Sequence, residues 1–230
     1  MQTTARTFRD IQQEYDQLFT REPIRDEARG YRSHAWVLLK ELPSRPQARV
    51  LDVACGGGYF FKELLGLAEG RLARPVGIDL SGRALQIASK ECPTALYLLS
   101  AGESLPFKEK TFDAVTCLGS LEHFLDIPSA VAEMKRVLRP GGIFFILVPN
   151  LFWYKDILSV LWSGDKLTRN QTHERFACLG EWKRTLQECG LTVRRTYKYN
   201  GIARKAWKQR LKDFLIPVRF SYHFLFICTA

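Results

Sequence analysis

Short apolar runs alternate with amphipathic stretches through most of the chain. The apolar runs suit buried parallel strands, because a strand covered on both faces needs no polar side. The stretches between them repeat their apolar residues at helical spacing. This alternation predicts an α/β fold with a doubly wound, mostly parallel sheet, right-handed crossovers and helices on both faces. The predicted strands are 50–53, 75–79, 95–99, 114–117, 143–148, 192–200 and 220–228, and the predicted helices between them are 59–68, 83–91, 128–138 and 180–189.

Residues 1–230 are predicted to form a single domain, because the apolar content is enough for one good core. Apolar residues recur at helical spacing over 8–19 and again over 35–42, so 1–44 is expected to form a helical cap. The proline-containing segment 43–46 ends it. Residues 45–150 then form the predicted cofactor-binding core.

Two segments stand apart from this pattern and are predicted to be inserts that cover an acceptor site. The first, 151–176, begins with the unusually apolar and aromatic sequence LFWYKDILSVLW. In the second, 201–219, Trp207, Leu211, Phe214 and Leu215 fall on one helical face, with basic residues elsewhere. A basic amphipathic helix of this kind serves either as a closing lid or, through 204–219, as a peripheral membrane contact.

A glycine-rich turn follows the first predicted strand. Glycines 56–58 allow positive φ angles and let a ligand approach the backbone amides at the start of the next helix. A dinucleotide fingerprint would require a third glycine at position 61, which is Phe61, so NAD is disfavoured. Asp52 precedes the turn and Asp79 ends the next strand, where a carboxylate can accept both hydroxyls of a ribose.

The sequences VLDVACGGG (50–58) and GIDLS (77–81) resemble those of class I S-adenosylmethionine-dependent methyltransferases. The motifs ESLPF (103–107), FDAVTC (112–117), LEHF (121–124) and RVLRPGG (136–142) follow in that family's order. The resemblance implies S-adenosylmethionine as cofactor, and a seventh strand that is antiparallel and inserted between strands five and six. The implied cofactor-binding residues are Asp52, Ala54, Cys55, Gly56, Gly57, Gly58, Asp79, Leu80, Gly102, Glu103, Leu118, Gly119 and Ser120.

One position departs from the family pattern. Many relatives carry an acidic side chain for the adenine amino group at the place held here by Ala101. Adenine recognition is therefore expected to rest on the backbone of Gly102 and Glu103, or on another side chain.

His123 is the candidate general base, because it follows the fourth strand and imidazole titrates near neutral pH. A structural histidine shared by relatives with different acceptors is the competing interpretation. The candidate acceptor-pocket residues are Tyr15, Trp153, His173 and Arg175, each of which has a packing or surface role as its alternative. The four histidines are scattered along the chain, so no metal site is predicted.

These features predict methyl transfer to a small or amphiphilic acceptor. A lipid-linked, anionic molecule is one acceptor of this kind. The net charge of +10 leaves open both an anionic partner and a solvated basic surface. RNA methylation is the alternative in another substrate class, but nucleic acid is disfavoured because the fourth strand ends in TCLG rather than NPPY. A non-catalytic cofactor-binding subunit is the third alternative.

The chain shows no Cys-x-x-Cys pair, no apolar signal core and no transmembrane segment. Reduced cysteines and a cytoplasmic location are expected, either free or peripheral to the inner face of a membrane.

Overall fold

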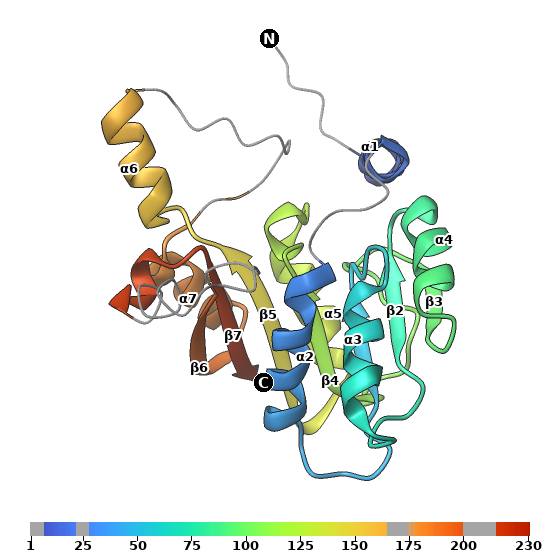
Figure 1. Cartoon of the computed structure of the whole chain (residues 1–230). Helices are drawn as coiled ribbons and strands as arrows, with labels where there is room; N and C mark the ends of the chain where they lie inside the picture. The colour runs from blue at the N-terminus through green and yellow to red at the C-terminus, as the bar shows by residue number, and fades with distance from the viewer. Residues whose placement is uncertain (1–6, 22–27, 165–174, 176, 200–214) are drawn as a thin grey trace.

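A seven-stranded sheet in the order β3-β2-β1-β4-β5-β7-β6 organises the molecule (Figure 1). The computed structural model describes residues 7–21, 28–164, 175, 177–199 and 215–230. Neighbouring strands from β3 to β5 are parallel, whereas β7 is antiparallel to both β5 and β6. The predicted fold and the inserted antiparallel strand are confirmed. The strands are β1 Val50–Val53, β2 Val76–Asp79, β3 Leu96–Leu99, β4 Phe112–Leu118, β5 Leu138–Pro149, β6 Thr192–Tyr199 and β7 His223–Thr229.

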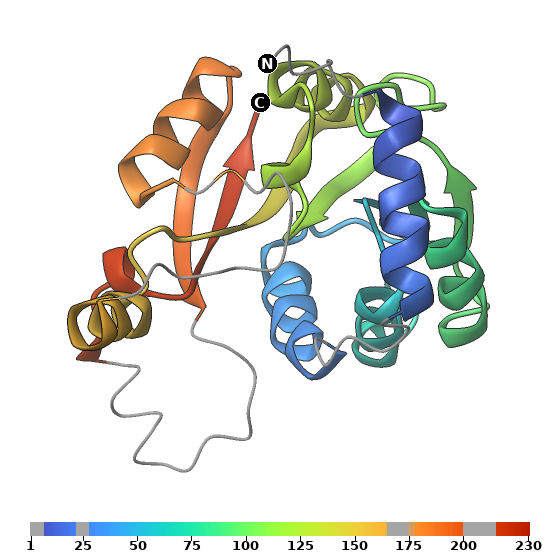
Figure 2. The same cartoon turned by 90° about the horizontal axis from the view of Figure 1, so that it is seen from above.

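Helices α2, α3 and α4 cover one face of the sheet, and α5 and α7 cover the other (Figure 2). Helix α1 lies across the edge where the parallel strands end and contacts α4. Two short 3-10 helices, η1 and η2, occur in connections. The helices are α1 Phe8–Arg21, α2 Ala28–Glu41, α3 Tyr59–Ala68, α4 Gly82–Glu91, η1 Leu121–His123, α5 Ile127–Val137, α6 Tyr154–Ser163, α7 Leu179–Glu188 and η2 Val218–Phe220.

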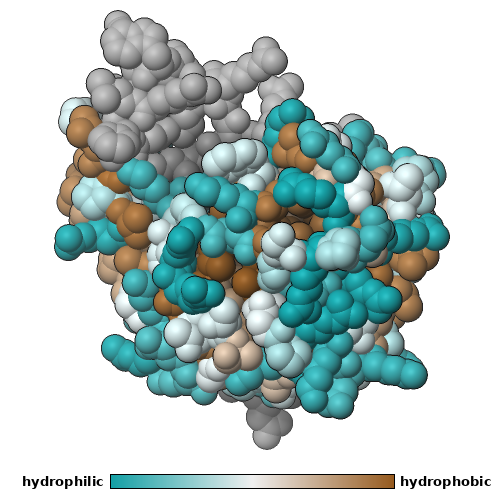
Figure 3. All heavy atoms as spheres, turned by 90° about the horizontal axis from the view of Figure 1, so that it is seen from below, coloured by the Kyte–Doolittle hydropathy of each residue, from teal (hydrophilic) through white to brown (hydrophobic). Residues whose placement is uncertain are grey.

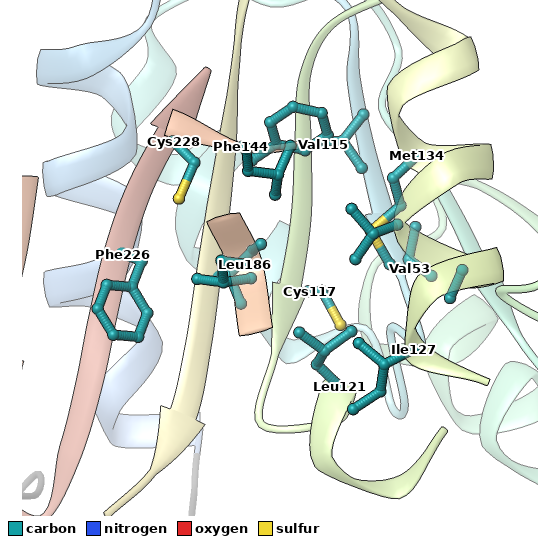
Figure 4. Packing of buried hydrophobic residues seen from close by; sticks show 14 of the residues in the cluster. Val53, Val115, Cys117, Leu121, Ile127, Met134, Phe144, Leu186, Phe226 and Cys228 are labelled. Atoms are coloured by element: carbon teal, nitrogen blue, oxygen red, sulfur yellow. The ribbon is translucent and has the colours of Figure 1, made fainter. Parts of the chain in front are cut away.

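The apolar strands and the inward faces of the helices form a core on each side of the sheet. On the α5 and α7 side, Met134 and Leu186 pack against Val115, Phe144 and their neighbours, and all of these side chains are fully or almost fully buried (Figure 4). The buried residues of α5 lie in this core: Ile127, Ala130, Val131, Met134 and Val137. Both faces of the central strands are therefore covered by packed apolar side chains. This packing holds the ends of those strands in fixed positions relative to one another.

The predicted starts of β5 and β7 are the strand boundaries furthest from the structure, and the others differ by two residues or fewer. Strand β5 begins at Leu138 rather than at 143, because Leu138 pairs with Phe112 before a register shift. Strand β7 begins at His223 rather than at 220, because η2 occupies Val218–Phe220.

Strand β3 is at the edge of the sheet and is more exposed than its apolar sequence suggests. No helix occupies residues 100–111 between β3 and β4. Leu96 and Leu98, which point to the same face of the strand, remain exposed.

The two predicted inserts are described only in part. Helix α6 occupies much of the first insert, whereas 165–174 and 176 lie outside the described residues. The predicted basic helix falls mostly on 200–214, which also lies outside them. In the parts of the chain that the structure describes, no helix is both long enough and apolar enough to cross a bilayer.

Candidate active site

The turn between β1 and α3 adopts left-handed backbone conformations that favour glycine. The φ angles are +59° at Ala54, +52° at Gly56 and +72° at Gly58. A Cβ atom at Gly57 would lie 2.7 Å from the ring of Tyr59. The turn therefore presents bare backbone next to the start of α3, which is the arrangement predicted for cofactor binding.

Asp79 fixes this turn to the end of β2. Its Oδ2 accepts a hydrogen bond from the backbone N–H of Gly56 at 2.8 Å, and its Oδ1 accepts one from the N–H of Ser81 at 2.8 Å. Burial raises the pKa of Asp79 to about 6, and the N–H donors of Ser81 and Gly56 oppose that rise. A carboxylate has about four lone-pair sites, so these two bonds leave acceptor capacity for a pair of ribose hydroxyls.

Asp52 lies within the sheet rather than at the pocket surface. The hydroxyl of Thr116 on β4 donates a 2.5 Å hydrogen bond to its Oδ1. Burial raises the pKa of Asp52 to about 7, the Thr116 hydroxyl lowers it and the charge of Asp79 raises it further. Asp52 is thus placed to support the strand ends below the turn.

A pocket opens at the carboxyl edge of the sheet, where open parallel sheets bind their ligands. The strand ends supply its floor and the first helix supplies apolar cover. Of the predicted cofactor and catalytic residues, those lining it are Ala54, Cys55, Gly56, Gly57, Asp79, Leu80, Gly102, Glu103, Leu118, Gly119, Ser120 and His123. Asp52 and Gly58 are not among its lining residues.

Helix α1 forms one wall of the pocket through an apolar stripe. Phe8, Ile11, Tyr15 and Phe19 line the pocket, and the ring of Phe19 lies 3.5 Å from where a Cβ of Gly56 would be. The helical spacing of these residues predicted this stripe from the sequence. Tyr15 thereby lies in the pocket where it was expected.

Asp16, on the adjacent face of α1, was not identified from the sequence. Its Oδ1 accepts a 2.5 Å hydrogen bond from the hydroxyl of Ser81, and a 3.1 Å bond from the N–H of Arg83 at the start of α4. The hydroxyl of Ser81 also caps α4, because it accepts a hydrogen bond from the backbone N–H of Ala84. This contact joins residues that are far apart in the sequence. Only the capping role of Ser81 could be predicted from the sequence.

His123 closes the pocket beside the end of β4. Its side chain is 9% exposed, and its Nε2 lies 4.0 Å from Oε1 of the buried Glu122. The ring of Tyr15 meets it edge-on at a centroid distance of 6.3 Å. The imidazole therefore has a carboxylate and an aromatic ring as neighbours, and it also lines the cavity.

Two of the remaining predicted acceptor residues, Trp153 and Arg175, do not line the pocket. The ring of Trp153 packs on the ring of Tyr222, with 4.6 Å between the two centroids. Arg175 is exposed, and its backbone N–H donates to the carbonyl oxygen of Glu122 at 3.0 Å. His173 lies outside the described residues. Tyr31, which the sequence offered with Tyr15 as a possible cofactor contact, lines the pocket, whereas sequence reasoning missed Tyr59, Ser100, Phe124 and Leu125, which also line it.

These residues fit S-adenosylmethionine. A bare glycine turn beside a helix start suits its methionine part, and Asp79 suits its ribose. Ala101 lines the pocket without an acidic group, while Gly102 packs so closely that a Cβ would lie 2.7 Å from Phe124. The part of the pocket expected to hold the adenine is therefore lined by backbone and by an aromatic ring.

Comparison with known proteins identifies related sequences and structures. A family profile described as a methyltransferase domain matches residues 51–146. The chain is 30% identical over 171 residues to the ubiquinone biosynthesis O-methyltransferase of Leptothrix cholodnii, covering 69% of this chain and 71% of that protein.

Two solved structures share the fold. One is the putative methyltransferase in a complex with the Haloferax volcanii Trm112 methyltransferase activator, with a TM-score of 0.66, 20% identity and 97% of each chain covered. The other is a SAM-dependent methyltransferase from Aquifex aeolicus, with a TM-score of 0.59, 17% identity and coverage of 84% of this chain and 88% of that one.

Proposed function

Because this chain belongs to the class I S-adenosylmethionine-dependent methyltransferases, we propose that it methylates a hydroxyl group on a small, lipophilic acceptor. The observation that carries the proposal is the position of His123 in the cofactor pocket, next to Glu122 and Tyr15. Quinone-pathway names among the relatives, ubiquinone biosynthesis O-methyltransferase and demethylmenaquinone methyltransferase, support a lipophilic acceptor.

The cofactor supplies an electrophilic methyl group on a sulfonium. The chain contributes alignment and proton removal. His123 would take the proton of the acceptor hydroxyl, and bound S-adenosylmethionine would supply the methyl group that the hydroxyl oxygen accepts, with S-adenosylhomocysteine as the other product. The nearby Glu122 carboxylate stabilises the imidazolium that results.

The pocket walls support this acceptor class. Phe8, Ile11 and Phe124 give the cavity an apolar lining, and Leu125 at its border is exposed. An apolar wall favours an apolar acceptor body, whereas the polar groups lie along the strand ends. Tyr15 is proposed to contact the acceptor, because its ring faces His123.

The test is methyl transfer from deuterated-methyl cofactor, followed by mass spectrometry. The purified chain is offered lipophilic phenols and quinols, total RNA, or neither. We expect label on the lipophilic hydroxyl compounds only. Label on RNA alone, or cofactor binding without transfer to any acceptor, overturns the proposal.

The role of His123 is tested separately. A general base contributes roughly 10²–10⁴-fold, so His123→Ala should lower kcat by about two orders of magnitude. Calorimetric affinity for S-adenosylhomocysteine should stay unchanged. Added imidazole should restore part of the rate, and the rising limb of the pH–rate profile should disappear. An unchanged profile excludes His123 as the base.

A further inference from the structure

The second half of α6 carries large apolar side chains into solvent. Leu158 is 59% exposed, Leu161 78% and Trp162 95%. Positions 158, 161 and 162 are spaced i, i+3 and i+4, so these side chains form one stripe on the helix. Every residue from Leu158 to Gly164 is exposed, so no described part of the chain covers this stripe.

The root of α6, in contrast, is fixed to the body. Trp153 packs on Tyr222, and Asp156 in the first turn is buried. Just before the helix, Asn150 donates hydrogen bonds to the carbonyl oxygens of Arg219 and Ser221 at 2.9 and 2.7 Å. The helix therefore projects from an ordered base, at the edge of the sheet where the pocket opens (Figure 1).

More exposed apolar residues lie at this end of the molecule. Phe152 lies next to the root of α6, Leu215 precedes η2, and Phe220 is the last residue of η2, which lies near α6 in both ribbon views (Figures 1 and 2). The face seen from below is different: hydrophilic residues cover most of it, with small hydrophobic patches between them (Figure 3). The most exposed apolar side chains, Leu161 and Trp162, thus lie at the α6 end, although Trp36 on α2 and Leu99 on β3 are also exposed.

The sequence around this apolar end is basic. Lys155 lies over the Trp153 ring and Arg219 lies over the Phe220 ring. In the sequence, 165–174 balances Lys166 and Arg169 against Asp165 and Glu174, whereas 201–214 has an excess of basic residues, with Arg204, Lys205, Lys208, Arg210 and Lys212 against Asp213. Positive charge beside exposed leucine and tryptophan complements a surface that is apolar inside and anionic outside. The same charge opposes pairing with a second copy of this chain, which would bring the two basic segments together.

We propose that the exposed stripe of α6, Leu158, Leu161 and Trp162, inserts into the interfacial region of an anionic lipid bilayer. Trp162 lies at headgroup level, where tryptophan side chains favour the boundary between water and hydrocarbon. The proposal rests on the lipophilic acceptor inferred above, because docking at this edge brings the pocket to the phase in which such an acceptor dissolves. It names α6, an element of the described fold, as the contact.

The test uses the full chain and sedimentation with phosphatidylcholine vesicles, with and without phosphatidylglycerol. We expect co-sedimentation with the anionic vesicles, weakened by high salt. The Leu161→Ser/Trp162→Ser variant should lose roughly tenfold or more in vesicle affinity, because two large apolar side chains no longer leave water. The matched control is Trp36→Ser/Leu99→Ser, which removes an exposed tryptophan and an exposed leucine on α2 and β3 and should pellet like wild type.

Failure of this proposal differs from failure of the proposed function. Equal pelleting of wild type and the α6 variant, or none by wild type, overturns membrane docking even if a soluble phenol is methylated normally. Sedimentation velocity that shows a dimer lost in the α6 variant, without vesicle binding, also overturns it in favour of a second copy. Loss of methyl transfer to every lipophilic acceptor, with vesicle binding intact, overturns the proposed function instead.

Discussion

The backbone N–H of Gly56 donates a 2.8 Å hydrogen bond to Oδ2 of Asp79, and this bond ties the turn after β1 to the end of β2. One carboxylate therefore orders the glycine turn, and the same carboxylate is the one proposed to accept the ribose hydroxyls. Because the bond crosses between neighbouring strand ends, the pocket floor is set before any ligand arrives.

Replacing Asp79 with alanine should weaken S-adenosylhomocysteine binding by at least about tenfold, because a charge-assisted contact to the ribose is lost. Isothermal calorimetry measures this directly. Asp113→Asn is the matched control: Asp113 is also a buried aspartate, but it pairs with Arg45 and Arg139 near the start of β4. The Asp113→Asn variant should have a lower free energy of unfolding and an unchanged affinity for S-adenosylhomocysteine. Equal affinities in wild type and Asp79→Ala would remove Asp79 from the ribose site.

Much of this site follows from the sequence because it is local. The glycines, Asp79 and the end of β4 each lie just beyond an apolar run, so a parallel sheet brings them to one edge. The apolar stripe of α1 was equally visible from its spacing.

Contacts made by distant segments were not predictable in this way. The position of Asp16 on the start of α4 depends on how α1 lies across the sheet edge, which no periodicity reports. Trp153 was expected in the acceptor pocket because it is aromatic and follows β5, yet it packs on Tyr222, a contact between segments far apart in sequence. The exposure of Leu96 and Leu98 follows from a missing helix rather than from their own strand pattern.

Asp52 should make stability depend on pH. Its pKa is about 7 in the folded chain and near 3.9 when unfolded, so between these values the folded state binds more protons. The stability contributed by the neutral form is therefore complete below about pH 4 and is lost as pH rises through 7.

The variant Asp52→Asn lacks this titration. Relative to it, the free energy of unfolding of wild type should fall by up to about 3 kcal/mol between pH 4 and 8. Urea denaturation at several pH values measures the difference. The pKa of Asp79, also raised, adds a slope of the same sign that remains in the variant. Two parallel stability curves would contradict the assignment to Asp52.

Ala101 offers a gain-of-affinity test. It lines the pocket at the place where the resemblance to class I methyltransferases implies an acid for the adenine amino group. Ala101→Asp should strengthen S-adenosylhomocysteine binding about threefold to tenfold, because a charged acceptor then meets an N–H donor. Sinefungin, which keeps the adenine, should gain equally, whereas an analogue with the amino group removed should gain nothing. A gain shared by that analogue would place the adenine elsewhere.

Asp16 should control how firmly α1 covers the pocket. No residue of α1 is buried, so its polar contact with Ser81 and Arg83 carries a large share of its attachment. Asp16→Asn removes a negative charge from the start of α4. The interaction of that charge with the helix start contributes about 1 kcal/mol, which corresponds to a roughly fivefold change in an equilibrium or rate constant. We expect S-adenosylhomocysteine to dissociate about fivefold faster, and backbone amides of α1 to exchange faster with deuterium. Gln17→Ala, an exposed position on the same helix, is the control and should change neither rate. If Asp16→Asn leaves both rates at wild-type values, α1 is held by its apolar stripe alone, and the hydrogen bond to Ser81 contributes nothing to closure.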